Sequence, residues 1–109
     1  MKNTIDLESI RQELQQYESR LISFRKTVHE NPEVGFNTQD TLARIKSILE
    51  EFGIKGLDTE TSPGSGFLLI EGNRPGATVA LRADIDALPI EEKTECAWTS
   101  KNGNAHSCG

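Results

Sequence analysis

The apolar residues in the first third of the chain recur at the spacing of a helix. Over residues 6–30, six of them follow one another at intervals of four and three, and charged or amide side chains fill most positions between them. This period places one apolar stripe along a helix. Pro32 has no amide hydrogen and ends the pattern. We therefore expect a helix over this segment. Its buried stripe is Ile10, Leu14, Tyr17, Leu21, Phe24 and Val28.

A second helix is predicted directly after the loop that follows Pro32. Asn37 and Thr38 are both suitable N-caps, and the apolar period then runs as far as Phe52. Gly53 suits the left-handed backbone that commonly follows the last helical turn. The stripe expected to be buried is Leu42, Ile45, Leu49 and Phe52.

Beyond residue 54 the pattern favours strands. Residues 67–70 and 78–82 are short apolar runs, and the Gly/Pro-rich segment 72–76 between them is typical of a turn. Two strands joined by a short turn are expected to pair antiparallel, and residues 91–109 have the composition of a loop. The predicted fold class is therefore α/β, with two helices followed by strands that pack against them.

Composition narrows the classes of function. A chain of 109 residues is long enough for one small domain, and its net charge of -5 disfavours nucleic acid as a partner. No apolar run approaches the length of a membrane span, and the N-terminal residues lack the apolar core of a signal peptide. We therefore expect a cytoplasmic protein without a membrane partner, in which Cys96 and Cys108 are free thiols.

Two aspartates follow the second predicted strand. Asp84 and Asp86 are two residues apart, so both side chains would point to the same face if the strand continues through them. Two carboxylates on one face repel each other unless a cation or a proton lies nearby. They could bind a metal or orient a metal-bound histidine. Alternatively, one caps the next turn and the other is solvated, since aspartate is common in turns.

A histidine and a cysteine lie close together near the end of the sequence. His106 and Cys108 offer an imidazole and a thiolate, a combination that suits zinc or a related transition metal. With Cys96 and His29 the chain barely reaches four ligands for a closed zinc site, and their spacing is irregular. A Cys96–Cys108 disulfide is another reading. His29, near a helix end, is more typical of a structural hydrogen-bonding residue.

Three segments together resemble one family. Residues 25–36 contain a basic pair, a histidine and Pro-Glu-Val-Gly-Phe; residues 79–90 read VALRADIDALPI; residues 105–109 read AHSCG. In this order they resemble the peptidase M20 amidohydrolases, in the branch that acts on N-acyl amino acids, hippurate and auxin conjugates. Thr38 stands where that family usually has Glu, and Ser107 where Ala is common.

The resemblance implies a fold and a metal site. It implies the N-terminal part of a zinc-exopeptidase-like α/β/α catalytic domain, with two divalent ions (zinc, manganese or cobalt) in the complete enzyme. Cys108 would be a metal ligand, and Asp86 would orient the site without contacting the ion. Asp84 stands where other M20 branches have a ligand histidine, so no ligand role is carried over to it. The glutamate that acts as general base has no counterpart in this chain.

The resemblance also implies that the chain is incomplete. Residues 1–109 match the N-terminal portion of the M20 catalytic domain, so the rest of that domain and the dimerisation domain are expected elsewhere. We expect the whole enzyme to be a homodimer that hydrolyses small N-acyl amino acids, and this chain to be inactive alone. The alternative is a non-catalytic fragment, either a binding or complementing module or a decayed gene product.

Overall fold

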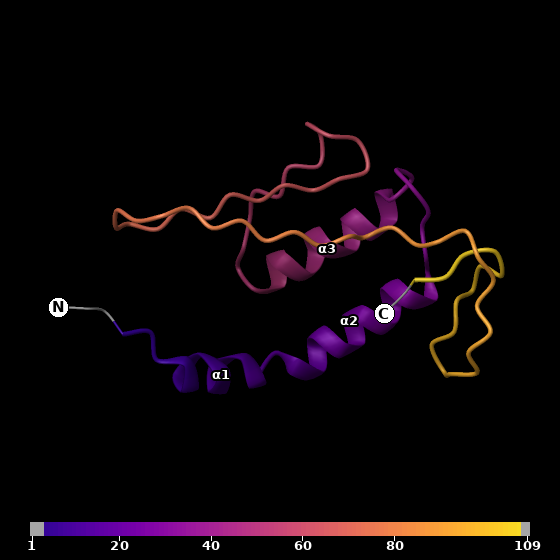
Figure 1. Cartoon of the computed structure of the whole chain (residues 1–109), viewed down its shortest axis with the longest axis horizontal. Helices are drawn as coiled ribbons and strands as arrows, with labels where there is room; N and C mark the ends of the chain where they lie inside the picture. The colour runs from indigo at the N-terminus through magenta and orange to yellow at the C-terminus, as the bar shows by residue number, and fades with distance from the viewer. Residues whose placement is uncertain (1–3, 108–109) are drawn as a thin grey trace.

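The chain is elongated. The computed structural model describes residues 4–107, and its principal extents are 55 × 33 × 21 Å (Figure 1). The radius of gyration is 16.7 Å, whereas a compact domain of this length has a radius of about 13 Å. Much of the chain therefore lies outside any shared core.

The helix predicted over residues 6–30 is divided in two. Helix α1 spans Leu7–Gln15 and helix α2 spans Glu18–Glu30. Asp6 caps α1, because its side chain accepts a hydrogen bond from the backbone N–H of Ser9 at 3.1 Å. The break lies at Tyr17, whose ring packs edge-on against Phe52 with 5.0 Å between the ring centroids. A tertiary contact thus accompanies a division that the local period did not indicate.

Most of the stripe predicted to be buried on this helix is exposed. The exposed members are Ile10, Leu14, Tyr17 and Leu21, whereas Phe24 and Val28 are half-buried. The period correctly identified an apolar face, but the described chain places little against its N-terminal half.

Helix α3 confirms its prediction closely. It spans Gln39–Glu51, with Thr38 at the N-cap position and Phe52 at the C-cap. Gly53 has φ +77°, the left-handed conformation expected after the last turn. The buried side of the helix includes Leu42, as predicted, and also Ile48, which the predicted stripe omitted. The other residues predicted to be buried, Ile45, Leu49 and Phe52, are only half-buried.

The N-terminus of α3 is capped from outside the helix. The hydroxyl of Thr38 donates to the carbonyl of Gly64 at 2.8 Å and makes no capping bond. Glu33 supplies the cap, since its carboxylate accepts from the backbone N–H groups of Thr41 at 2.5 Å and Asp40 at 3.3 Å. A carboxylate is favourable here because unpaired N–H groups and the helix dipole make this end positive. The cap ties the loop after α2 to α3.

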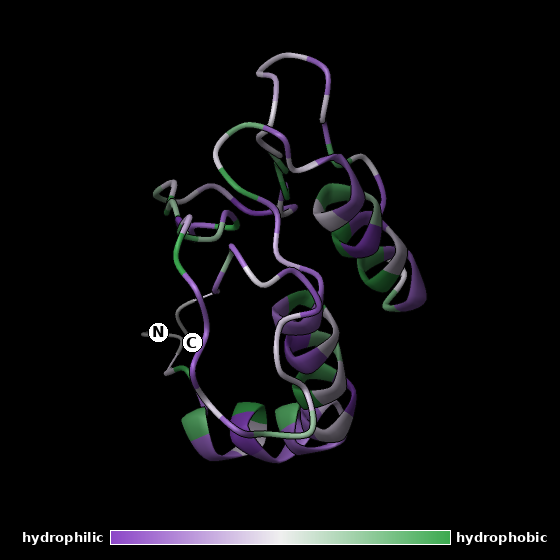
Figure 2. Cartoon of the chain, turned by 90° about the vertical axis from the view of Figure 1, so that its right-hand side faces the viewer, coloured by the Kyte–Doolittle hydropathy of each residue, from purple (hydrophilic) through white to green (hydrophobic). Residues whose placement is uncertain are grey.

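Helices α2 and α3 run antiparallel. At one end Arg20 makes a two-pronged pair with Glu51, at 2.7 and 2.8 Å, and at the other end the capping carboxylate of Glu33 joins them. Seen along the molecule in Figure 2, the helices carry mixed apolar and polar faces. Within residues 4–107 no helix is both long and apolar enough to cross a bilayer.

The predicted strand pair is not formed in the described chain. The first of the two predicted strands makes one bridge, in which Phe67 and Asp58 exchange two backbone hydrogen bonds of 2.8 and 2.9 Å. No backbone–backbone hydrogen bond within residues 4–107 holds residues 68–86. Most of the large apolar side chains there are exposed, with Leu81 at 96 %. Strand propensity alone does not form a strand, because each strand needs a neighbour for its ladder.

The packed part of the molecule is small and unusually polar. Among the described residues its buried members are Leu42, Ile48, Ala87, Ala105, His29, Thr38 and Thr41. Pro32 is buried beside them. Most of these residues lie where the loop after α2, the first turn of α3 and the C-terminal segment meet, and this is where the candidate site lies.

Candidate functional site

The three segments that carry the sequence motifs converge in space. Leu88 and His106 form an antiparallel bridge with two backbone hydrogen bonds, each of 2.9 Å. On its other side, the N–H of Ala87 donates to the carbonyl of Glu33 at 2.7 Å, and Val34 pairs parallel with Ala87. The end of the central motif therefore lies between the first motif and the last.

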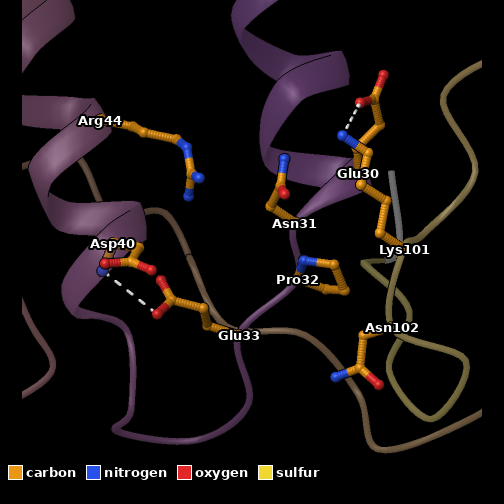
Figure 3. Close-up of a pocket in the computed structure, with 8 residues that line it drawn as sticks. All are labelled: Glu30, Asn31, Pro32, Glu33, Asp40, Arg44, Lys101 and Asn102. Carbon is orange, nitrogen blue, oxygen red and sulfur yellow. Dashed lines mark hydrogen bonds and ion pairs between the residues drawn. The ribbon is translucent and has the colours of Figure 1, made fainter.

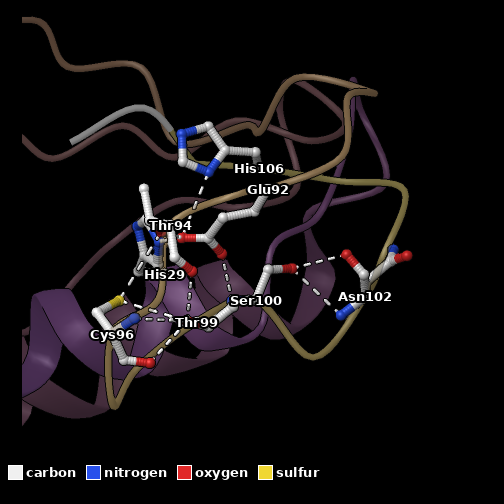
Figure 4. A network of polar contacts seen from close by, with 8 residues as sticks. All are labelled: His29, Glu92, Thr94, Cys96, Thr99, Ser100, Asn102 and His106. Carbon is white, nitrogen blue, oxygen red and sulfur yellow. Dashed lines mark hydrogen bonds and ion pairs between the residues drawn. The ribbon is translucent and has the colours of Figure 1, made fainter.

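A buried carboxylate lies beside this junction, between two histidines (Figure 4). Nε2 of His29 is 2.6 Å from Oε1 of Glu92, and Nδ1 of His106 is 3.6 Å from the same oxygen. The two imidazole rings meet edge to face with 5.3 Å between centroids. The Glu92 side chain is only 2 % exposed. We call these three residues the His29–Glu92–His106 cluster.

Backbone and hydroxyl donors complete the surroundings of Glu92. The hydroxyl of Thr94 donates to Oε1 at 2.5 Å, and the backbone N–H of Ser100 donates to Oε2. The Thr94 hydroxyl, then His29, then the Ser100 N–H lower the pKa of Glu92 to about 2. Hydrogen bonds that favour the ionised form thus outweigh burial, which acts in the opposite direction. Glu92 is a charged carboxylate at neutral pH.

The cluster has the composition of a metal site but is closed by its own hydrogen bonds. One ligand atom from each residue lies within 4.8 Å of the other two, and two imidazoles with a carboxylate suit divalent transition metals. Two ligand atoms on one tetrahedral zinc are about 3.3 Å apart, whereas His29 and Glu92 are at 2.6 Å. An ion would have to separate that pair. The arrangement fits residues that support a neighbouring site better than residues that enclose an ion.

The predicted ligand and the other cysteine differ in what the structure describes. Cys108 lies outside the described residues, two positions beyond His106. Cys96 is a free, half-buried thiol, as the sequence predicted. A hydrogen bond with Thr99 is the main cause that lowers the pKa of Cys96.

The two aspartates do not join the cluster. Asp84 pairs with Arg82 at 2.8 Å and is 69 % exposed, and Asp86 is exposed too. Both border a cavity of about 350 Å³ between α2, α3 and residues 83–86, which His29 and Ser107 also line. Because residues 83–86 form no strand, the predicted shared face of the aspartates is not established. The role of Asp86 stays a prediction.

A second pocket, of about 250 Å³, lies at the junction of α2 and α3 (Figure 3). Lys101 docks there on the last residue of α2, because its backbone N–H donates to the carbonyl of Glu30 at 2.8 Å and its ammonium pairs with that carboxylate at 3.4 Å. The pocket therefore marks where the C-terminal segment attaches to the helices. Its lining is Glu30, Asn31, Pro32, Glu33, Asp40, Arg44, Lys101 and Asn102.

Comparison with known proteins decides the family. No family model matches the chain, and no solved structure matches it. The chain is similar to the N-acetyl-L-cysteine deacetylase of Bacillus subtilis, with 43 % identity over 107 residues, 97 % of this chain and 26 % of that protein. The N-acyl-L-amino acid amidohydrolase of Geobacillus stearothermophilus is 36 % identical over 103 residues, 94 % of this chain and 28 % of that protein. Thermostable carboxypeptidase 2 of Saccharolobus solfataricus is 36 % identical over 104 residues, again 94 % of this chain, and 26 % of that protein.

The chain belongs to the M20 amidohydrolases. It spans about a quarter of the length of the curated relatives that it matches. The resemblance inferred from three short motifs is thus confirmed by sequence identity along 94–97 % of these 109 residues.

Sequence reasoning missed Glu92, the centre of the cluster. It lies in a polar stretch among Glu91, Lys93 and Glu95, and nothing in that pattern separates a buried acid from a solvated one. The interpretation of His29 as a hydrogen-bonding residue is confirmed by its bond to Glu92. Only the structure shows that the acid in contact with His29 is Glu92.

Proposed function

We propose that this chain supplies part of the metal site of an amidohydrolase that cleaves the amide bond of N-acyl amino acids. The M20 relationship and the names of the relatives, which include two deacetylases and an amidohydrolase, support this assignment. The observation that carries it is the convergence of the three motifs on the bridge between Leu88 and His106, two residues before Cys108. A metal site needs ligands in fixed positions, and these contacts hold the segment that leads to the proposed ligand Cys108 against the other two motifs.

Each residue of the chain has a limited task in this proposal. Cys108 binds a divalent ion (zinc, manganese or cobalt) through its thiolate, which coordination favours over the thiol. Bound ions of this kind polarise the scissile carbonyl and lower the pKa of a water. Asp86 orients the site without contacting the ion. The general base and the other ligands of the two-ion site come from residues that this chain does not contain.

The assembly is part of the same proposal. We expect the whole enzyme to be a homodimer that acts on small N-acyl amino acids, and this chain alone to be inactive, since it lacks most ligands and the base. A complementing role is the second candidate. It is favoured by the exposed apolar side chains of Val79 and Leu81, which suit pairing with another polypeptide.

A chimaera tests the proposal. This chain would replace the matching segment of the G. stearothermophilus amidohydrolase, and hydrolysis of N-acetyl amino acids would be measured with and without chelator. We expect turnover that chelator abolishes. Turnover that survives removal of the metal would contradict the mechanism.

Two cysteine variants of the chimaera provide a matched pair. Cys108→Ala should lower metal content and turnover together, because it removes a ligand. Cys96→Ala should change neither by much, because the hydrogen bonds of Cys96 among residues 4–107 are with Thr94, Thr99 and its own loop. Equal losses at the two positions would favour a disulfide or a different ligand set. The 109-residue chain alone, given zinc or manganese, should show no turnover above the blank.

A further inference from the structure

We propose that residues 89–104 form a lid that opens from α2 as one body while the rest of the chain stays folded. The opening goes beyond the proposed function and does not depend on it, because it involves neither a metal ion nor a catalytic residue. The two ends of this segment and its body are held in different ways, and this difference makes a lid.

The ends of the lid are fixed by backbone pairing and burial. Leu88 and His106 exchange two backbone hydrogen bonds of 2.9 Å, which bring the two ends together. The neighbouring residues Ala87 and Ala105 are only 2 % and 1 % exposed. The N–H of Ala87 also donates to the carbonyl of Glu33 at 2.7 Å. These contacts make the two ends a firm hinge.

The body of the lid adds no apolar side chain to the core. Ile90 is 48 % exposed and Trp98 is half-buried. The enclosed group of this segment is instead the carboxylate of Glu92, with a side chain 2 % exposed. Segments with few buried apolar contacts open at a lower free energy than the rest of a fold. Polar contacts therefore hold the body of the lid in place.

These polar contacts lie on one face of α2. Lys26, His29 and Glu30 are at positions i, i+3 and i+4 of that helix, so their side chains are neighbours. The ammonium of Lys26 lies 4.0 Å from the centroid of the Trp98 ring. The carbonyl of Glu30 accepts from the N–H of Lys101 at 2.8 Å, and the two side chains pair at 3.4 Å. Both contacts are only partly enclosed and are of modest strength.

The third contact joins the docking of the lid to its internal structure. The Glu92 carboxylate accepts from Thr94 and Ser100 of the lid itself and shares a hydrogen bond of 2.6 Å with His29 of α2 (Figure 4). Opening breaks the bond to His29, whereas the bonds from Thr94 and Ser100 stay within the lid. The lid therefore keeps its shape as it moves. Because His29 also lines the cavity of about 350 Å³, opening uncovers a residue in the wall of that cavity.

Amide hydrogen exchange, followed by NMR in the 109-residue chain, tests this movement. The amide of Lys101 bonds across to α2, and the amide of Ser100 bonds within the lid. We expect Lys101 to exchange faster than Ser100, and faster than His106 at the hinge. Trp98 is the only tryptophan in the sequence, so quenching of its fluorescence by acrylamide gives a second measure of opening.

Two variants loosen the docking from the side of α2. His29→Leu removes the bond to Glu92, so the amide of Lys101 should exchange roughly tenfold faster or more. Lys26→Gln removes the contact with Trp98, so the same amide should exchange roughly two- to fivefold faster. Both variants should make Trp98 more accessible to acrylamide. Lys46→Gln, a matched change at an exposed position of α3, should alter neither measurement.

Three results would overturn the lid. Exchange at Lys101 that neither variant accelerates would show that these contacts do not hold the segment. Equal acceleration at Lys101 and Ser100 would show that the segment melts instead of moving as one body. Equal acceleration at Lys101 and at Leu42 in α3 would show that the whole chain unfolds. Lys26→Gln is a change at the surface of the helix, so it decides the question even if His29→Leu does not fold.

Discussion

Two regions of this chain contrast sharply in what they bury. In the His29–Glu92–His106 cluster, the side chains of His29 and Glu92 are only 10 % and 2 % exposed and share a hydrogen bond of 2.6 Å. Along residues 67–82, large apolar side chains such as Phe67, Val79 and Leu81 face solvent. In the polar region, segments distant in sequence meet and pack. In the apolar region, the chain makes few contacts with the rest of the molecule.

The difference shows that apolar composition does not by itself locate a core. A strand buries its side chains only when a ladder holds it in register, and residues 68–86 have no backbone hydrogen bond within the described chain. At the cluster, the carboxylate of Glu92 accepts hydrogen bonds from His29, Thr94 and Ser100, so its burial is tolerated. Specific contacts decide where this small chain packs.

The largest expected effect comes from making the same substitution in both regions. Leu42→Ala removes a side chain that is only 7 % exposed and should lower the free energy of unfolding by about 2–4 kcal/mol. Leu81→Ala removes an exposed one and should change it by less than about 0.5 kcal/mol. Urea unfolding of the chain, followed by the fluorescence of Trp98, measures both. Similar losses would mean that residues 78–82 are packed in solution and would break the contrast.

Lowering the pH should destabilise the His29–Glu92–His106 cluster, whereas the apolar run of residues 67–82 is not expected to respond. The pKa of Glu92 falls from an ordinary value of 4.5 to about 2, so its contribution to stability is complete above pH 4.5. That contribution should be lost as pH falls from about 4.5 to about 2. The stability difference between the parent and Glu92→Gln, measured by urea unfolding at several pH values, should shrink through this window. A difference independent of pH would show that Glu92 is not ionised in the folded chain.

A moderate effect is expected at the start of α3. Glu33→Ala removes the side-chain cap that the described residues give this helix and should lower the free energy of unfolding by about 1 kcal/mol. Glu60→Ala, at an exposed loop position, is the control. Loss of helical circular dichroism should accompany the change at Glu33 only. If both variants unfold alike, the cap does not form.

The smallest effect is expected at the far end of the helix pair. Arg20 and Glu51 are two-fifths to one-half exposed, so water and salt screen their attraction. Arg20→Gln should therefore shift the melting temperature least of this series, and added salt should remove even that shift. A large, salt-independent change would place this pair among the contacts that hold α2 against α3.

Features that depend on neighbouring residues in the sequence could be predicted, and features that depend on contacts between distant segments could not. Helix α3 was predicted, with Asn37 or Thr38 as the N-cap and an end at Phe52 before Gly53, because period, cap position and terminal glycine are all local signals. The division at Tyr17 was not, because it coincides with a contact to Phe52, distant in sequence. Of the candidate site, the sequence identified His29 as a hydrogen-bonding residue and His106 by its motif. It gave no sign of Glu92, because exposed and buried glutamates look alike in a polar stretch.

The sequence by itself determined the family, the apolar faces of the helices and the segments that carry chemistry, since these depend on residue identity and local spacing. Only the tertiary structure decided which acid of the polar stretch has a buried side chain, which helix end it contacts, and that residues 68–82 make no backbone hydrogen bond within the described chain. Burial and pairing are properties of distant segments that meet. No local pattern records the partner that a side chain or a strand will find.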